Sequence, residues 1–287
     1  MNKDGIYTII YKEDKEYPKA LLQLSDPPKC LYCLGNISLL NSRCIGIVGS
    51  RKFSEYGLRA TCDISQALAK GGITIVSGMA RGVDSAAHKS ALEVDGKTIA
   101  VLGCGIDQCY PAGNWRLKDE IVSKGLVISE YPPGVHGAKW TFPRRNRIIA
   151  ALSEMIIVTE AGLNSGSLIT AELAMEMSKE VVVVPASIFN PYGVGGNQLI
   201  ADGAQMALSI NDILETAGVS AKIEKEEKQL SKEEREILEM IRRNGEMTVD
   251  SLARHMNLKI SRVNGFITVL EMKGFLKTSL GRVFLSR

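Results

Sequence analysis

The stretch CIGIVGSRKFSEYG (44–57) decides the fold, because an apolar run leads through a glycine and a polar loop into a helical pattern. The run CIGIVG (44–49) shows no alternation of polar and apolar residues, which is typical of a strand covered on both faces. Five more runs of this kind follow along the chain: ITIVS (73–77), TIAVLG (98–103), LVIS (126–129), MIIVTE (155–160) and VVVVP (181–185).

Helical patterns separate these runs, for example at 55–70 and 82–94. Strands and helices in alternation indicate βαβ units, and their crossovers are right-handed. We therefore predict an α/β domain over residues 44–217 that is built on a doubly wound parallel sheet.

The segments on either side differ in character. Residues 1–43 are rich in turns and interrupted by prolines, so we expect a short lead-in segment packed on the main domain. KIEKEEKQ (222–229) is a run of charges, and it predicts a charged linker over residues 218–230.

Residues 231–287 form a pattern of their own. SKEEREILEMIRR (231–243) is amphipathic and begins with a predicted capping box of Ser231 and Glu234. Two more helical segments and two short strands follow, which is the order of a winged helix. We therefore predict a small C-terminal winged-helix-like domain, which holds 11 Lys and Arg against 7 Asp and Glu.

Composition sets the protein class. The 287 residues suggest about two domains, and 45% hydrophobic residues supply enough apolar material for a core, which excludes wholesale disorder. A net charge of +3 does not by itself indicate nucleic acid. Six cysteines are too few for a disulfide scaffold, and no apolar run or signal-peptide pattern points to a membrane. We expect a cytoplasmic protein with reduced thiols and no membrane partner.

Two loops carry residues suited to phosphate. Ser50 and Arg51 follow the first predicted strand, where open α/β sheets bind ligands and a helix start favours an anion. The glycines there lack the GxGxxG spacing and alone indicate only a tight turn, but Arg51 beside them favours a phosphate. Further along, TEAGLNSGSLITAELA (159–174) offers a nest of backbone donors at Ser165, Gly166 and Ser167.

The densest basic cluster of the chain is KWTFPRRNRIIAALS (139–153). Arginine forks suit phosphate oxygens, and aromatic faces stack on the bases of single strands. The alternative is a basic helix start paired with acidic residues, and we expect at least one of the arginines to be paired in that way. The candidate DNA-binding residues of the cluster are Lys139, Phe142, Arg144 and Arg147.

Nothing in the sequence predicts an enzyme. No GxxxxGK[ST] motif is present, so ATP hydrolysis has little support. Asp84 and His88 are four residues apart on one predicted helix, but no nucleophile accompanies them, so we expect a structural histidine. Cys30 and Cys33 have no second pair at zinc-site spacing. We therefore predict no catalytic residue, no metal and no cofactor.

Taken together, the segments resemble a known family. The similarity covers about residues 15–210 in the right order and is carried by YPKALLQLSDPPKCLYCLG, IGIVGSRKFSEYG, VSGMARGVDSAAH, GKTIAVLGCGIDQCYP, LVISEYPPG, FPRRNRIIAALS, SGSLITAELA and GGNQLIADGA. These strings closely resemble the DNA-processing protein A (DprA, also called Smf) family.

The resemblance implies an extended Rossmann-like fold that binds single-stranded DNA without catalysis. It also implies DNA processing in natural transformation (competence), in which a homodimer protects incoming DNA and delivers the RecA recombinase for recombination. By motif position, the DNA groove would be lined by Ser50, Arg51, Lys139, Phe142, Arg144, Arg147 and the Ser165–Ser167 loop.

Two other functions stay open. The first is a nucleotide-ligand-binding or phosphoribohydrolase-like enzyme of the same broad fold, although those enzymes rely on PGGxGTxxE and the comparable loop here is EAGLNSGSLIT. The second is a helix-turn-helix regulator, whose recognition helix over 259–273 would be only mildly basic. Single-strand binding is the function that the sequence favours.

Overall fold

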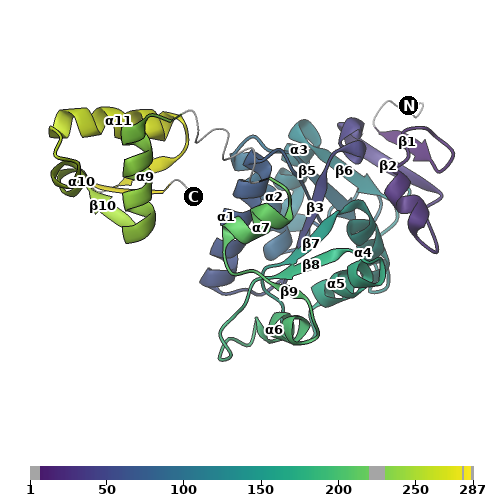
Figure 1. Cartoon of the computed structure of the whole chain (residues 1–287). Helices are drawn as coiled ribbons and strands as arrows, with labels where there is room; N and C mark the ends of the chain where they lie inside the picture. The colour runs from purple at the N-terminus through teal and green to yellow at the C-terminus, as the bar shows by residue number, and fades with distance from the viewer. Residues whose placement is uncertain (1–6, 220–229, 280, 286–287) are drawn as a thin grey trace. The chain divides into compact units, whose positions relative to one another are not determined.

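The computed structural model describes residues 7–219, 230–279 and 281–285. The chain divides into two compact units, Met1–Gly218 and Val219–Arg287 (Figure 1). Most of the predicted linker, residues 220–229, lies outside the described residues.

The first unit is built on a nine-stranded sheet with the order β1-β2-β6-β5-β4-β3-β7-β8-β9. From β6 to β9 all neighbouring strands are parallel. The predicted α/β fold with a doubly wound parallel sheet is confirmed, because each of the six apolar runs forms one of these strands. They are β3 (Cys44–Val48), β4 (Thr74–Ser77), β5 (Thr98–Leu102), β6 (Leu126–Ser129), β7 (Met155–Val158) and β8 (Glu180–Val183).

The strand order reverses direction in the middle of the sheet. The chain places β3, β4, β5 and β6 in turn toward one side of the sheet, then returns to place β7 beside β3, with β8 and β9 (Gln205–Met206) beyond it. Such a switch point opens a crevice at the carboxyl ends of the central strands, which is the usual ligand site of open α/β sheets.

The N-terminal segment contributes two strands that the sequence did not predict. β1 (Thr8–Tyr11) pairs antiparallel with β2 (Cys30–Gly35), and β2 pairs antiparallel with β6. The 3₁₀ helices η1 (Lys19–Gln23) and η2 (Ile37–Asn41) complete this segment. Residues of the predicted lead-in therefore extend the main sheet.

Helices cover both faces of the sheet (Figure 1). One face carries α1 (Glu55–Lys70), α2 (Val83–Glu93), α3 (Trp115–Lys124) and α7 (Ile210–Thr216). α1 packs on α2 and α7, and α2 packs on α3, which follows η3 (Ala112–Asn114). The other face carries α4 (Thr141–Leu152), α5 (Gly166–Glu176) and α6 (Val194–Ala201). The central strands are buried between these layers, which is why their sequences are continuously apolar.

The second unit has the predicted winged-helix architecture. It comprises α9 (Lys232–Asn244), α10 (Val249–Met256), α11 (Ile260–Met272) and a sheet of β10 (Glu246–Thr248), β12 (Arg282–Leu285) and β11 (Leu276–Ser279). The predicted capping box at Ser231 and Glu234 is present. Ile237, Leu252 and Val263 belong to a core that this unit builds by itself.

Candidate functional site

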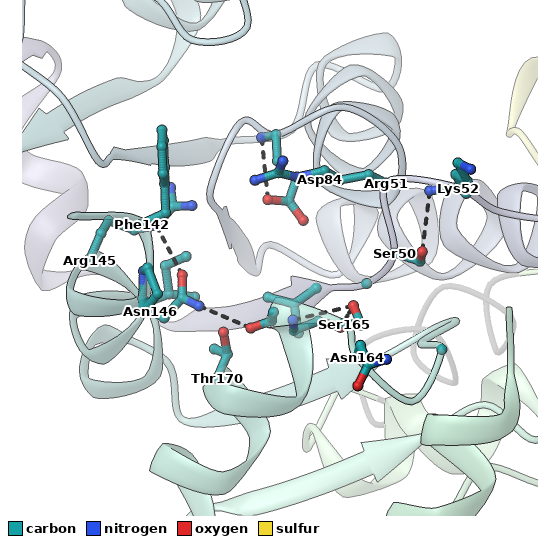
Figure 2. Close-up of a pocket in the computed structure, with 18 of the residues that line it drawn as sticks. Ser50, Arg51, Lys52, Asp84, Phe142, Arg145, Asn146, Asn164, Ser165 and Thr170 are labelled. Atoms are coloured by element: carbon teal, nitrogen blue, oxygen red, sulfur yellow. Dashed lines mark hydrogen bonds between the residues drawn. The ribbon is translucent and has the colours of Figure 1, made fainter. Parts of the chain in front are cut away.

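A pocket of about 1050 Å³ lies at the carboxyl ends of the central strands. Its walls come from the loops that follow β3, β4, β5, β6, β7 and β8, together with the start of α4 (Figure 2). The pocket therefore occupies the crevice that the reversal of strand order creates.

The loop after β3 presents two cations. The Ser50 N–H donates to the Glu160 carbonyl (2.7 Å), and the Ser50 hydroxyl accepts from the Lys52 N–H (3.2 Å; Figure 2). This tight turn leaves Arg51 and Lys52 exposed, and both line the pocket. Lys52 was not among the residues predicted for the site.

A buried carboxylate fixes that loop from below. Glu160 is 1% exposed and accepts from the Ser54 N–H and the Ser54 hydroxyl, each at 2.7 Å. It also accepts from Asn190 Nδ2 at 2.6 Å. Glu160 thus joins the loops after β3, β7 and β8, and so holds three walls of the pocket in register.

The start of α5 supplies backbone donors. Ser165 is the N-cap, and its hydroxyl accepts from the Ser167 N–H at 3.4 Å. The hydroxyls of Ser165 and Ser167 lie 2.7 Å apart, and both residues line the pocket with Gly166. A helix N-terminus with small polar side chains favours an anion.

The guanidinium of Arg145 is buried beside the pocket. Its Nη1 donates to the carbonyl oxygens of Gly78 (2.6 Å) and Val101, and its Nε donates to Asn146 Oδ1 (3.1 Å). A Cβ at Gly78 would lie 2.4 Å from Arg145 Nη2, so only glycine allows this approach. Burial lowers the pKa of Arg145, and the nearby Asp84 charge opposes that shift.

Asp84 lines the pocket opposite this cation. Burial raises the pKa of its carboxyl, and the charge of Arg145 acts against that rise. Asp84 accepts from the Ala80 N–H at 3.3 Å (Figure 2). Asp84 and Arg145 are therefore part of the framework that positions the loop after β4 against β5.

Phe142 has an aromatic partner that the sequence did not reveal. The ring of Tyr110, from the loop after β5, lies 4.9 Å from that of Phe142 with a 40° tilt, and both residues line the pocket. Ideal Cβ atoms on Gly103 and Gly137 would come within 2.7 and 2.8 Å of Phe142, so backbone packs closely around this ring. The pair offers an aromatic surface in a fixed position.

The structure brings most of the predicted site residues together at this pocket: Ser50, Arg51, Lys139, Phe142, Ser165, Gly166 and Ser167. Arg144 and Arg147 are not among its lining residues. Arg144 pairs with Glu130 (3.4 Å) and Asp26 (2.9 Å), and Arg147 pairs with Glu130. The expectation that at least one arginine of the cluster pairs with an acid is met by both, and a role for these two in DNA binding stays a prediction.

His88 has the environment of a structural histidine. It is fully buried, its Nδ1 lies 2.6 Å from Thr98 Oγ1, and burial lowers its pKa to about 3. Because the Thr98 hydroxyl donates to the Ile75 carbonyl (2.7 Å), Nδ1 carries the proton and donates to Thr98. The imidazole is neutral and is held in one tautomer.

Membrane-spanning helices and metal-binding clusters are both absent from the residues that the structure describes. No helix among them is long and apolar enough to cross a membrane. No group of three or more His, Cys, Asp or Glu side chains in the same part of the chain could hold a metal ion.

A family model decides the family. The model described as DNA recombination-mediator protein A matches residues 8–218, the whole first unit from β1 onward. The chain belongs to this family. A second model, the MarR family, matches residues 230–279 in the winged-helix unit.

Among its relatives, DNA processing protein DprA of Streptococcus pneumoniae is 45% identical over 201 residues, which cover 70% of this chain and 71% of that protein. Protein Smf of Synechocystis is 45% identical over 210 residues, which are 72% of this chain and 53% of that longer protein. The chain thus spans about half of the Synechocystis relative.

Two solved structures of proteins named DNA processing protein A agree with the fold. The X-ray structure of DprA from Streptococcus pneumoniae superposes with a TM-score of 0.70 at 43% identity, covering 72% of this chain and 73% of that one. DNA processing protein A of Helicobacter pylori gives a TM-score of 0.68 at 37% identity, covering 73% and 94%. The latter was described for its single-stranded DNA binding mode.

Proposed function

We propose that this protein binds single-stranded DNA in the pocket at the carboxyl ends of β3 and β7, and that it serves DNA processing during natural transformation. The observation that carries the proposal is one arrangement of groups. Three exposed cationic side chains, the backbone donors of Ser165–Ser167 and the Tyr110–Phe142 ring pair line the same pocket.

Each of these groups matches a part of a single strand. Arg51 offers a fork to a phosphate, Lys52 and Lys139 act as point charges, and the start of α5 offers N–H donors. The aromatic rings offer a face to an unpaired base, which a duplex keeps inside its stack. The Helicobacter pylori relative, described for single-strand binding, supports this function.

Further parts of the proposal follow the family. We propose that a homodimer in the cytoplasm delivers the RecA recombinase to the bound strand, and that the protein performs no catalysis. The neutral, buried His88 supports the last part, because an imidazole with a pKa of about 3 is a weak base at neutral pH. Its hydroxyl partner, Thr98, is fully buried and already donates to the Ile75 carbonyl.

Binding of one DNA sequence as single strand and as blunt duplex tests the proposal. Fluorescence anisotropy at several salt concentrations should show tighter binding of the single strand. The logarithm of the affinity should fall with that of salt with a slope of about −2, since each of three cationic contacts contributes about −0.7. Equal affinity for the duplex, or a flat salt response, would overturn the proposal.

A further inference from the structure

The loop that supplies Asn190 to Glu160 also carries exposed apolar side chains, and these have no part in the contacts described so far. It joins β8 to α6 over residues 184–193. Phe189 is 89% exposed, more than any other large hydrophobic side chain that the structure describes, and its neighbour Ile188 is 80% exposed. Apolar side chains kept in water on a loop indicate a contact surface, because burying them would be favourable.

This loop is fixed to the pocket. Asn190 donates to the buried Glu160 carboxylate, which also holds the loop after β3. Pro191 and Tyr192 line the pocket itself. Since consecutive Cα atoms are about 3.8 Å apart, the Cα atom of Phe189 lies within about 8 Å of that of Pro191. Phe189 is therefore at the rim of the pocket.

The order of strands in the sheet sets the order of the binding groups along the carboxyl ends of those strands. Tyr110 follows β5, Ser50 and Arg51 follow β3, Ser165 follows β7 and Phe189 follows β8. Four strand spacings of about 4.8 Å separate β5 from β8, which makes about 19 Å. Aromatic residues thus follow the two outer strands of this set, β5 and β8, and the anion-binding groups lie between them.

The charge of the loop indicates which part of a ligand it meets. Residues 181–201 contain no Asp, Glu, Lys or Arg, so this end neither attracts nor repels phosphates. A base presents an uncharged face and suits such a surface, while Arg51 and Lys52 remain available to its phosphates.

We infer that Phe189, flanked by Ile188, stacks on a base of the single strand after it leaves the pocket. The inference rests on the proposed function and deepens it. The binding site then extends to the loop after β8. Its second base-stacking position lies about 19 Å from the Tyr110–Phe142 pair, measured across the strands.

Oligonucleotide length provides the test. Labelled oligo(dT) of about 3 and about 12 nucleotides is titrated by anisotropy with the wild type, Phe189→Ala, Phe189→Leu and Phe189→Tyr. Tyr11→Ala is the control, because Tyr11 is 52% exposed, lies in the edge strand β1 and does not line the pocket. The Ala and Leu variants should bind the longer strand about 5- to 160-fold more weakly and the shorter strand equally well. Phe189→Tyr and the control variant should bind both strands with the affinity of the wild type.

Each other outcome has a meaning. Full affinity of Phe189→Leu for the longer strand would overturn the inference, because leucine is apolar but has no ring face. Unchanged DNA binding with weaker self-association of Phe189→Ala in sedimentation would make the loop a protein contact instead, and would also overturn it. A wild type that binds neither length would contradict the proposed function itself.

Discussion

At the scale of single residues, variants of Arg51, Lys139 and Phe142 can distinguish the contribution of charge to DNA binding from that of stacking. Arg51→Ala and Lys139→Ala should each weaken single-strand binding and reduce the salt slope by about 0.7, because each removes one phosphate contact. Phe142→Ala should weaken binding by about 1–3 kcal/mol and leave the slope unchanged. Anisotropy over a salt series measures both quantities.

Lys124→Ala is the control for these variants, since Lys124 is half-exposed, pairs with Glu120 and does not line the pocket. Because Phe142 is closely packed, circular dichroism and melting must show that Phe142→Ala is folded. Unchanged affinity in a folded Arg51→Ala, Lys139→Ala double variant would place the DNA groove elsewhere.

His88 should make stability depend on pH. Its pKa is lowered to about 3 by burial, whereas an unfolded histidine titrates near 6.5. Between these values the unfolded chain binds a proton that the folded chain excludes, so the stabilisation is complete above pH 6.5 and is lost as the pH falls toward 3. The slope should approach about 1.4 kcal/mol per pH unit below pH 6.

Denaturant unfolding at pH 7, 6 and 5 measures this effect. His88→Asn can keep the donor to Thr98 and has no group that titrates in this range. The free energy of unfolding of this variant should therefore depend less steeply on pH. The difference in slope should correspond to the uptake of about one proton on unfolding. Equal pH dependence of the two proteins would refute the assignment.

Physical reasons explain why some residues of the pocket were not predicted from the sequence. Tyr110 lies in an irregular loop, and only the folding of that loop places its ring on Phe142. Arg145 looks like its basic neighbours in sequence. The orientation of α4 against the sheet turns Arg145 inward and leaves Arg144 and Arg147 to pair with Glu130. Ser50 and Arg51 were predictable because the end of a parallel strand fixes their position.

At the scale of elements, the ion pair of Glu130 joins the loop after β6 to α4. Glu130→Gln should lower the free energy of unfolding by about 3 kcal/mol, because the Arg147 side chain, 12% exposed, loses its anion. Glu154→Gln is the matched control: its ion pair with Arg43 is half-exposed and should cost less than about 1 kcal/mol. Chemical denaturation compares the two, and equal losses would contradict the difference in burial.

Element type was predictable where burial dictates the sequence. The strands β3 to β8 are covered by helices on both faces, so each appears as an uninterrupted apolar run. β2 pairs antiparallel and has alternating burial, so it is not an uninterrupted apolar run. The prolines near it favoured the prediction of a turn-rich segment instead. β9 has two exposed residues, which give no periodic signal at all.

At the scale of the whole molecule, the charges of the two units raise a question about where DNA binds. Residues 231–287 carry a net charge of +4 and residues 1–230 a net charge of −1, from 24 Lys and Arg against 25 Asp and Glu. Overall charge would direct a polyanion to the winged-helix unit. The pocket favours the first unit instead, because it gathers Arg51, Lys52 and Lys139 around one hollow.

Cutting the chain after Gly218 decides between these views. Each unit has its own core, so residues 1–218 should stay folded and melt cooperatively. This fragment should bind a single strand with a salt slope within about one unit of that of the full chain, since a slope near −2 needs only the three cations of the pocket. A local cluster acts within about 10 Å at 0.1 M salt, and the net charge of the rest is screened. A folded fragment that no longer binds DNA would move the main site to residues 231–287.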